Sequence, residues 1–381
     1  MDPRYRPLYN AAYTDAFYAE LLKRLETRVS SPIPYRVAET PFFIPDALRD
    51  RLAASARGIL AEITEPGLIA KMKAAIPKEL DTPGMTAAPD CVQIDFAITR
   101  REDGELDGKV VELQAFPSLY AMMTLKLEVI SELMREKMPG LDRPWSIFYD
   151  GLDTKSFVER FRRAVVADHD PEEVVLLDLD PEQQKTYPDF VATRLLIGVE
   201  AVCPSKLLRQ GNKLFRDKDG RRVPVKRIYN RIVFDELERA QIELPFKYTD
   251  ELDVTWCSHP NWYWVLSKYT LPFVRHPAVP RARTLTEIGK DVPQNLEDYV
   301  LKPLFSFAGA GVKVDVTKAD LDAVPASQRD GWLLQEKITY HPGILMPDGN
   351  GVKAEVRMMF LRTPDEPAPR LALNLVRLSR G

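Results

Sequence analysis

Hydrophobic and polar residues alternate with a period of two in two neighbouring stretches, 92–99 and 109–115, joined by an acidic turn that contains glycine. This alternation predicts a β-hairpin with one apolar and one polar face. The polar side chains expected to share a face are Gln93, Asp95, Glu112 and Gln114. Carboxylate and amide oxygens are hard ligands of the kind that Mg²⁺ prefers. A hairpin with a solvated face explains the same pattern, so both interpretations stay open.

Helical spacing dominates residues 11–80. Apolar residues such as Leu21 and Leu25 recur on one helical face, and a second amphipathic run covers 45–63. A longer helix is expected at 120–137, just before a Pro-Gly breaker. These helices predict a packing layer without catalytic residues.

Strands and helices alternate between residues 145 and 255. The expected strands are 145–150, 172–180 and 198–202, and the expected helices are 154–166 and 187–196. A hairpin with an Asp-Gly turn at 219–220 follows. This alternation predicts a parallel sheet with ligand-binding loops at the carboxyl ends of its strands. The segment contains no GxGxxG motif, so a dinucleotide is not indicated.

A strand, a loop of small residues and a second strand are predicted at 299–316. Lys302 ends the first strand, and valines alternate along 312–316. The loop residues of interest are Ser306, Gly309 and Gly311. Backbone N–H groups in such a loop can approach an anion closely, and the lysine adds a charge, which suggests a phosphate clamp. An ordinary hairpin with a glycine loop accounts for the pattern equally well.

The last third of the chain adds further elements. A helix at 261–275 is expected to present Lys268, and a buried strand is expected at 332–338. Two strands, 355–362 and 371–381, are predicted to pair in antiparallel style.

The composition is that of a globular protein. Of 381 residues, 45% are hydrophobic and 29% are charged, and the length suits two or three packed units. The net charge of −3, from 53 basic and 56 acidic residues, gives no general attraction to nucleic acid or membranes. The N-terminus lacks an apolar signal core, and the three cysteines and four histidines are scattered. We therefore expect a cytoplasmic protein without a nucleic-acid or membrane partner; a homodimer is compatible with the sequence.

Three features of this chain recur together in ATP-grasp ligases. They are a helix lysine, Lys268, a strand-end lysine before a flexible loop, Lys302, and a strand that ends at 335–337. The order of the parts is unusual, because the E-x-Q motif at 112–114 lies far upstream instead of closing the module as an E-x-N strand. This permuted order resembles the circularly permuted ATP-grasp proteins, namely the eukaryotic-type glutathione synthetases and the glutathionylspermidine synthetases.

The resemblance implies an α/β (α+β) chain with a circularly permuted ATP-grasp fold and a parallel-sheet substrate domain. Residues 1–144 would form a helical layer and the metal-binding hairpin, 145–258 the substrate domain, and 259–381 the ATP-binding portion. The metal ligands implied are Asp95, Glu112 and Gln114. The ATP contacts implied are Lys268, Lys302, Ser306, Gly309, Gly311, Gln335, Glu336, Lys337 and Ile338. The residues implied to act on the transferred phosphate are Arg357, Arg377 and Lys302.

The activity implied is an ATP- and Mg²⁺-dependent ligation of a small-molecule carboxylate to an amine through an acyl-phosphate. The acceptor is expected near Ser118 and 229–231, although Ser118 is equally explained as a helix N-cap. Two departures weaken the catalytic reading: Gln93 stands where relatives carry an arginine, and Gln114 where they carry an asparagine. They favour a second hypothesis, a non-catalytic nucleotide-binding scaffold. A third is an ATP-dependent kinase.

Overall fold

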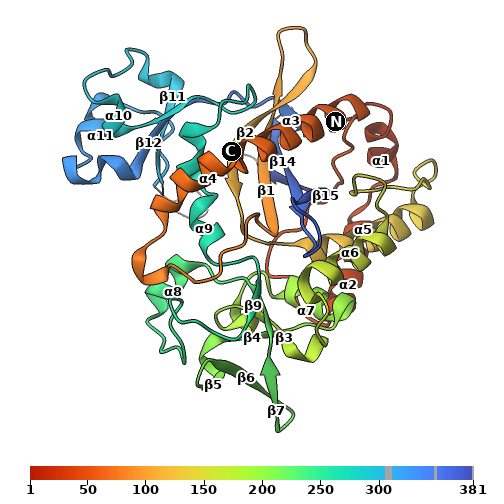
Figure 1. The fold of residues 1–381 in the computed structure, drawn as a ribbon. Helices are drawn as coiled ribbons and strands as arrows, with labels where there is room; N and C mark the ends of the chain where they lie inside the picture. The colour runs from red at the N-terminus through yellow and green to blue at the C-terminus, as the bar shows by residue number, and fades with distance from the viewer. Residues whose placement is uncertain (305–310, 347–349, 380–381) are drawn as a thin grey trace.

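The computed structural model describes residues 1–304, 311–346 and 350–379. The fold is α+β, with a central antiparallel sheet, a parallel sheet and two smaller three-stranded sheets (Figure 1). Helices from the first part of the chain, coloured red to yellow, flank the central sheet. Among the described residues, no helix has the length and apolar character needed to cross a bilayer.

The central sheet joins strands from the two ends of the sequence. Its members are β1 (Cys91–Arg100), β2 (Leu106–Gln114), β13 (Pro342–Leu345), β14 (Gly351–Leu361) and β15 (Arg370–Ser379). The order is β13-β14-β1-β2, β15 also pairs with β14, and all these pairings are antiparallel. The predicted hairpin and the two predicted C-terminal strands are confirmed. The long-range pairing of β1 with β14 is what brings the hairpin to the C-terminal residues.

The parallel sheet has the order β4-β3-β8-β9. Its strands are β3 (Val174–Leu177), β4 (Glu200–Val202), β8 (Arg227–Asn230) and β9 (Thr255–Cys257). The helices α6 (Thr154–Val166) and α7 (Tyr187–Ile197) are confirmed, as is the hairpin of β6 (Lys213–Lys218) and β7 (Arg221–Val225), which pairs with β5 (Leu208–Gln210). The strand predicted at 145–150 is wrong. Among the described residues that segment forms one bridge to β15, Phe148 to Leu373, with a backbone hydrogen bond on each side of it, and does not extend into a strand.

The third sheet consists of β10 (Ala282–Thr284), β12 (Trp332–Glu336) and β11 (Tyr299–Pro303) in that order, all antiparallel. The second strand predicted at 312–316 is wrong, since only one bridge, Leu301 to Lys313, forms there. Thr317 then caps the short helix α11 (Lys318–Asp322) through a capping box with Asp320, which turns the chain away from the sheet.

The helix predicted at 261–275 is split into two elements. Helix α9 (Asn261–Val265) is followed by a 3₁₀-helix, η6 (Lys268–Phe273), that begins after Ser267. Ser267 caps η6, and Pro272 has no N–H to continue an α-helical ladder. Lys268 is therefore the first residue of a new helix rather than part of a longer one.

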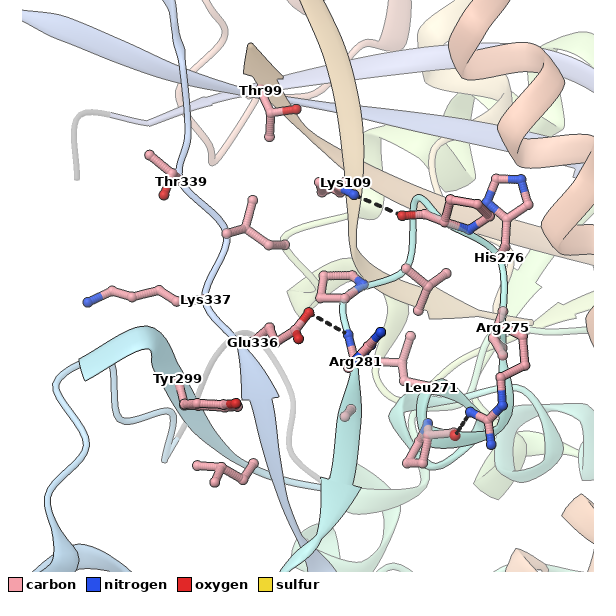
Figure 2. Close-up of a pocket in the computed structure, with 18 of the residues that line it drawn as sticks. Thr99, Lys109, Leu271, Arg275, His276, Arg281, Tyr299, Glu336, Lys337 and Thr339 are labelled. Carbon is pink, nitrogen blue, oxygen red and sulfur yellow. Dashed lines mark hydrogen bonds between the residues drawn. The ribbon is translucent and has the colours of Figure 1, made fainter. Parts of the chain in front are cut away.

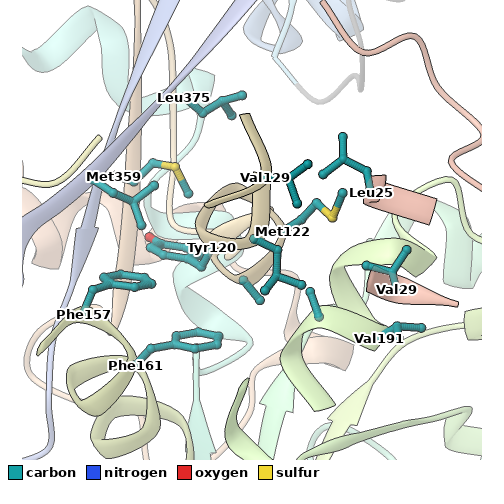
Figure 3. Packing of buried hydrophobic residues seen from close by; sticks show 14 of the residues in the cluster. Leu25, Val29, Tyr120, Met122, Val129, Phe157, Phe161, Val191, Met359 and Leu375 are labelled. Carbon is teal, nitrogen blue, oxygen red and sulfur yellow. The ribbon is translucent and has the colours of Figure 1, made fainter. Parts of the chain in front are cut away.

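The remaining helices of the described chain pack in several apolar clusters. They are α1 (Arg6–Ala12), α2 (Asp15–Val29), α3 (Asp46–Ile63), α4 (Pro66–Met72), α5 (Tyr120–Lys137), α8 (Phe234–Ala240) and α10 (Leu285–Ile288). Helix α3 packs closely on β2, where a Cβ added to Gly108 would lie 2.4 Å from Leu52. Figure 3 shows Tyr120 of α5 beside Phe157 and Phe161 of α6 and near Met359 of β14, all in one apolar cluster. This core connects the helices to both the central and the parallel sheet.

Candidate functional site

The candidate site begins on one face of the central sheet. Asp95 lies opposite Glu112 on β2 and opposite Arg357 on β14, and Gln93 lies opposite Gln114. Side chains that are directly opposite in an antiparallel pair share a face. The prediction that the polar residues of the hairpin lie together is therefore confirmed. An irregularity in the β1–β2 register between Asp95 and Phe96 separates this polar group from the outer part of the hairpin.

Asp95 is held by two arginines. Arg357 Nε donates to one Asp95 oxygen at 2.6 Å and Arg357 Nη2 to the other at 2.8 Å. Arg377 Nη2 donates to the second oxygen as well. The Asp95 side chain is 2% exposed, whereas that of Arg377 is 44% exposed. Both carboxylate oxygens of Asp95 therefore accept hydrogen bonds from arginine, and one of these arginines, Arg377, can reach solvent.

The two glutamines extend this network. Arg357 Nη1 and Gln114 Nε2 both donate to Gln93 Oε1, at 2.8 and 2.9 Å. Gln93 Nε2 donates to the Ser118 carbonyl at 2.9 Å. Gln93 thus ties Arg357 to β2 and to the start of α5. The amide oxygen of Gln114 is the part of that side chain left for another ligand.

Two lysines approach the same face from other elements. Lys302, at the end of β11, is 9% exposed, and its Nζ lies 3.5 Å from the Val111 carbonyl. Burial and the nearby Lys268 charge lower the pKa of Lys302 to about 8, although Glu112 and Glu355 oppose the shift. Burial also lowers the pKa of Lys268, and Glu112 opposes that shift too.

Glu112 is the carboxylate between these charges. In the described ranges it makes no hydrogen bond or ion pair, and it lines a small cavity of about 50 Å³ together with Gln114, Lys268 and Leu304. The Glu112 carboxylate is therefore the acidic group of the site that is best placed to receive a cation.

Glu355 completes the polar face on β14. Arg377 Nη2 lies 3.0 Å from one of its oxygens, and the Tyr340 hydroxyl donates to the other at 2.6 Å. Burial, and then this contact with the carboxylate, raise the pKa of Tyr340 well above its ordinary value. The sequence analysis missed Tyr340, because it lies outside any strand and only the fold brings it to β14.

A cleft of about 1590 Å³ lies between the outer part of the β1–β2 hairpin and the third sheet (Figure 2). The lining includes Lys109, Tyr299, Glu336, Lys337 and Ile338. Figure 2 shows the side chains of Glu336 and Lys337 extending in opposite directions; Glu336 Oε2 accepts the Arg281 N–H at 3.1 Å. Three of the four residues predicted at an adenine-binding segment therefore line a cleft.

The fourth, Gln335, is fully buried. Its side chain shares a face with Lys302, because β11 and β12 pair Val300 with Gln335 and Lys302 with Leu333. Neither amide atom of Gln335 has a hydrogen-bond partner in the described structure. A buried amide without partners normally costs about 1–3 kcal/mol. An unpaired amide on the same face as the desolvated Lys302 fits a polar ligand between the sheets.

The site fits a metal ion less well than it fits a polar ligand. Nowhere in the ranges that the structure describes does a group of three or more His, Cys, Asp or Glu side chains form a metal site. Glu112 and the Gln114 oxygen have the right chemistry, but Asp95 does not fit a metal while both its oxygens are bound by arginine. A metal role for Asp95 stays a prediction that requires the arginines to move.

The loop residues are only partly described. Ser306 and Gly309 lie outside the described residues. Gly311 is exposed with φ +75°, a conformation that favours glycine, and a Cβ there would lie 3.1 Å from Pro303. Its contact with phosphate stays a prediction.

The residues expected near an acceptor are buried. Tyr229, Asn230 and Arg231 are 1%, 3% and 1% exposed. Arg231 Nη1 lies 2.8 Å from Asp189, which also accepts the N–H groups of Leu119 and Met122 at the start of α5. Ser118 is not the N-cap; Leu119 occupies that position with φ +64°, and Asp189 supplies the capping oxygens. In this structure the cluster orders α5 and α7.

Comparison with known proteins adds one result to this geometry. The chain matches no protein-family model and no curated protein sequence. It is similar to the apo structure of a glutathione synthetase-like effector from Globodera pallida, with a TM-score of 0.60 at 13% sequence identity. The match covers 97% of this chain and 96% of that chain. The chain has a glutathione synthetase-like fold. Because the alignment is nearly complete, this fold includes the hairpin, the parallel sheet and the third sheet together.

Proposed function

We propose that the protein binds ATP between the central and third sheets and uses it to join a carboxylate to an amine. The observation that carries the proposal is the convergence of two desolvated lysines, Lys268 and Lys302, beside Glu112. Burial disfavours the charged form of both lysines, and the charge on Lys268 further disfavours the charge on Lys302. A polyanion bound between them would relieve both effects. The glutathione synthetase-like fold supports this choice of polyanion.

The nucleotide base would lie in the cleft beside 336–338. The N–H groups of Glu336 and Lys337 already donate to the Arg281 and Asp298 carbonyls, so the edge of a base would meet the other backbone groups of this segment. Tyr299 supplies an apolar wall. The orphaned Gln335 amide lies on the Lys302 side of the third sheet, where a ribose or phosphate oxygen would satisfy it. These residues would orient the triphosphate toward the polar face of β1 and β2.

The chain's own residues would then act by charge and position. ATP, when bound, supplies the phosphoryl group that activates the carboxylate, and Mg²⁺ would be held by Glu112 and Gln114. Lys268 and Lys302 would bind phosphate oxygens. Arg377, with its exposed side chain, is the arginine that can leave Asp95 to meet an incoming anion. Arg357 is buried and would keep Asp95 in place.

Titration calorimetry with ATP, in the presence and absence of Mg²⁺, tests nucleotide binding. We expect saturable binding that strengthens with Mg²⁺. No heat at millimolar ATP would contradict the proposal. A phosphate-release screen with pairs of carboxylates and amines then tests ligation, and release that requires both substrates is the expected result.

A second candidate function is nucleotide binding without turnover. The occupied oxygens of Asp95 favour it, since a site that uses two metal ions would need that carboxylate. The two candidates give different results in the screen. Tight ATP binding without phosphate release under any substrate pair would support the second and exclude the first.

A further inference from the structure

A separate pocket of about 520 Å³ lies beside the parallel sheet. Asp180 follows β3 and comes from the loop at its carboxyl end, and Glu200 lies on β4. In open α/β sheets, ligands bind outside the carboxyl ends of the strands. This pocket shares no lining residue with the cleft or with the cavity at Glu112.

Arg216 of β6 is a buried cation in the lining of this pocket. It is 2% exposed, and its Nη1 donates to Glu200 at 2.9 Å. Its Nε and Nη2 groups have no hydrogen-bond partner among the described residues. A buried guanidinium with two unmet donors is costly, and the planar fork of Nε and Nη2 matches the two oxygens of a carboxylate.

The rest of the lining carries charges of both signs, including Arg194, Lys206 and Asp217, and an apolar wall. Asp180 and Glu182 place carboxylates in the lining, and Tyr187 and Phe190 of α7 pack edge to face with ring centroids 6.5 Å apart. A pocket with a buried guanidinium, carboxylates and aromatic rings fits a molecule that carries both charges and an apolar group.

From this arrangement we infer that the pocket is a binding site for a small zwitterion with an apolar side chain, which is the chemistry of a free amino acid. Its carboxylate pairs with Arg216, its ammonium group faces Asp180 or Glu182, and its side chain packs on Tyr187 and Phe190. The inference does not depend on the function proposed for the cleft.

Calorimetry with L-phenylalanine as the probe tests the site. Two matched ligands each lack one charge: L-phenylalaninamide lacks the carboxylate, and 3-phenylpropionate lacks the ammonium group. We expect L-phenylalanine to bind and each matched ligand to bind about tenfold more weakly or worse, since each lacks one charge-assisted hydrogen bond. No binding of L-phenylalanine, or equal affinity for the three, would overturn the inference.

Arg216→Met should remove the preference for L-phenylalanine over L-phenylalaninamide. Arg222→Met, on the exposed face of the same hairpin, should retain it. If Arg216→Met does not fold, Glu200→Gln serves instead, because loss of the competing carboxylate should strengthen L-phenylalanine binding by about threefold or more. A preference that persists in Arg216→Met, or an affinity that does not rise in Glu200→Gln, would refute the role of Arg216.

Discussion

Two of the buried aspartate–arginine pairs in the described structure have different surroundings. Asp189 and Arg231 lie beside the parallel sheet, where the Arg231 guanidinium also packs over the rings of Phe116 and Phe190, at 5.5 and 5.0 Å. Asp95 and Arg357 lie on the central sheet at the edge of the proposed nucleotide site. Both pairs are made of the same chemical groups.

The difference is in what surrounds each carboxylate. Asp189 caps α5, and its partner Arg231 lies over two aromatic rings, so any change there disturbs the fold. Asp95 also contacts Arg377, whose side chain is 44% exposed and is shared with Glu355. We infer that the first pair serves structure, while the second leaves one arginine able to respond to a ligand.

The largest expected effect is on stability at the enclosed pair. Asp189→Ala should lower the free energy of unfolding by about 3–5 kcal/mol, because it leaves Arg231 buried without its partner. Urea unfolding followed by circular dichroism measures it. Glu182→Ala, at an exposed position, is the control. A loss below about 1 kcal/mol would show that the pair does not hold α5, since surface changes fall in that range.

The next largest effect concerns ligand binding. Lys302→Met should weaken ATP binding by about 2–5 kcal/mol, the range for truncating a buried charge partner. The fold should be retained, since methionine keeps the buried stem and removes a desolvated charge. Lys290→Met, at an exposed position of the same region, should bind ATP like the unmodified protein. Equal ATP affinity in calorimetry for all three proteins would exclude Lys302 from the site.

Asp95→Ala allows the stability contributions of the two pairs to be compared directly. It should cost about 2–3 kcal/mol of unfolding free energy, less than Asp189→Ala, because Arg357 keeps Gln93 and Arg377 keeps Glu355. The same urea experiment measures it. If Asp95→Ala lost as much unfolding free energy as Asp189→Ala, the two pairs would not differ in their structural role.

The sequence predicted which side chains share a face of the hairpin. It did not predict which residues from distant parts of the chain contact them. Alternation along β1 and β2 placed Gln93, Asp95, Glu112 and Gln114 on one face because strand geometry has a fixed period. The Asp95–Arg357 pair joins positions 262 apart, and only the register of β1 against β14 creates it. An apolar alternation also failed at 312–316, where one bridge at Lys313 forms in the described structure in place of the predicted strand.

A pH dependence is expected at the site. Because the pKa of Lys302 is about 8 in the free protein, Lys302 is charged below pH 8 and loses its charge above it. A bound anion raises that pKa, so ATP affinity should be level below pH 8 and fall by up to about tenfold per pH unit above it. Calorimetry from pH 6.5 to 9.5 measures this. A level profile in the unmodified protein, or a fall above pH 8 that persists in Lys302→Met, would contradict the assignment.

The smallest effect belongs to the parallel sheet. Burial raises the pKa of Asp178 to about 7, above its ordinary value of 3.8, although Arg231 opposes the shift. The folded state therefore holds a proton that the unfolded state releases between these values. The stabilising contribution is complete below about pH 4 and is lost as the pH rises through 7. Asp178→Asn should raise the melting temperature by about 1–3 °C at pH 8 and leave it unchanged at pH 4. The same shift at both pH values would show that burial of the charge is not the cause.

The central claim is that Lys268 and Lys302 hold a triphosphate between the two sheets. A crystal structure with a non-hydrolysable ATP analogue and Mg²⁺ tests it most directly. We expect phosphate oxygens within hydrogen-bond distance of both lysine Nζ atoms, with the base beside 336–338. An analogue bound elsewhere, or lysines that touch no phosphate, would contradict it.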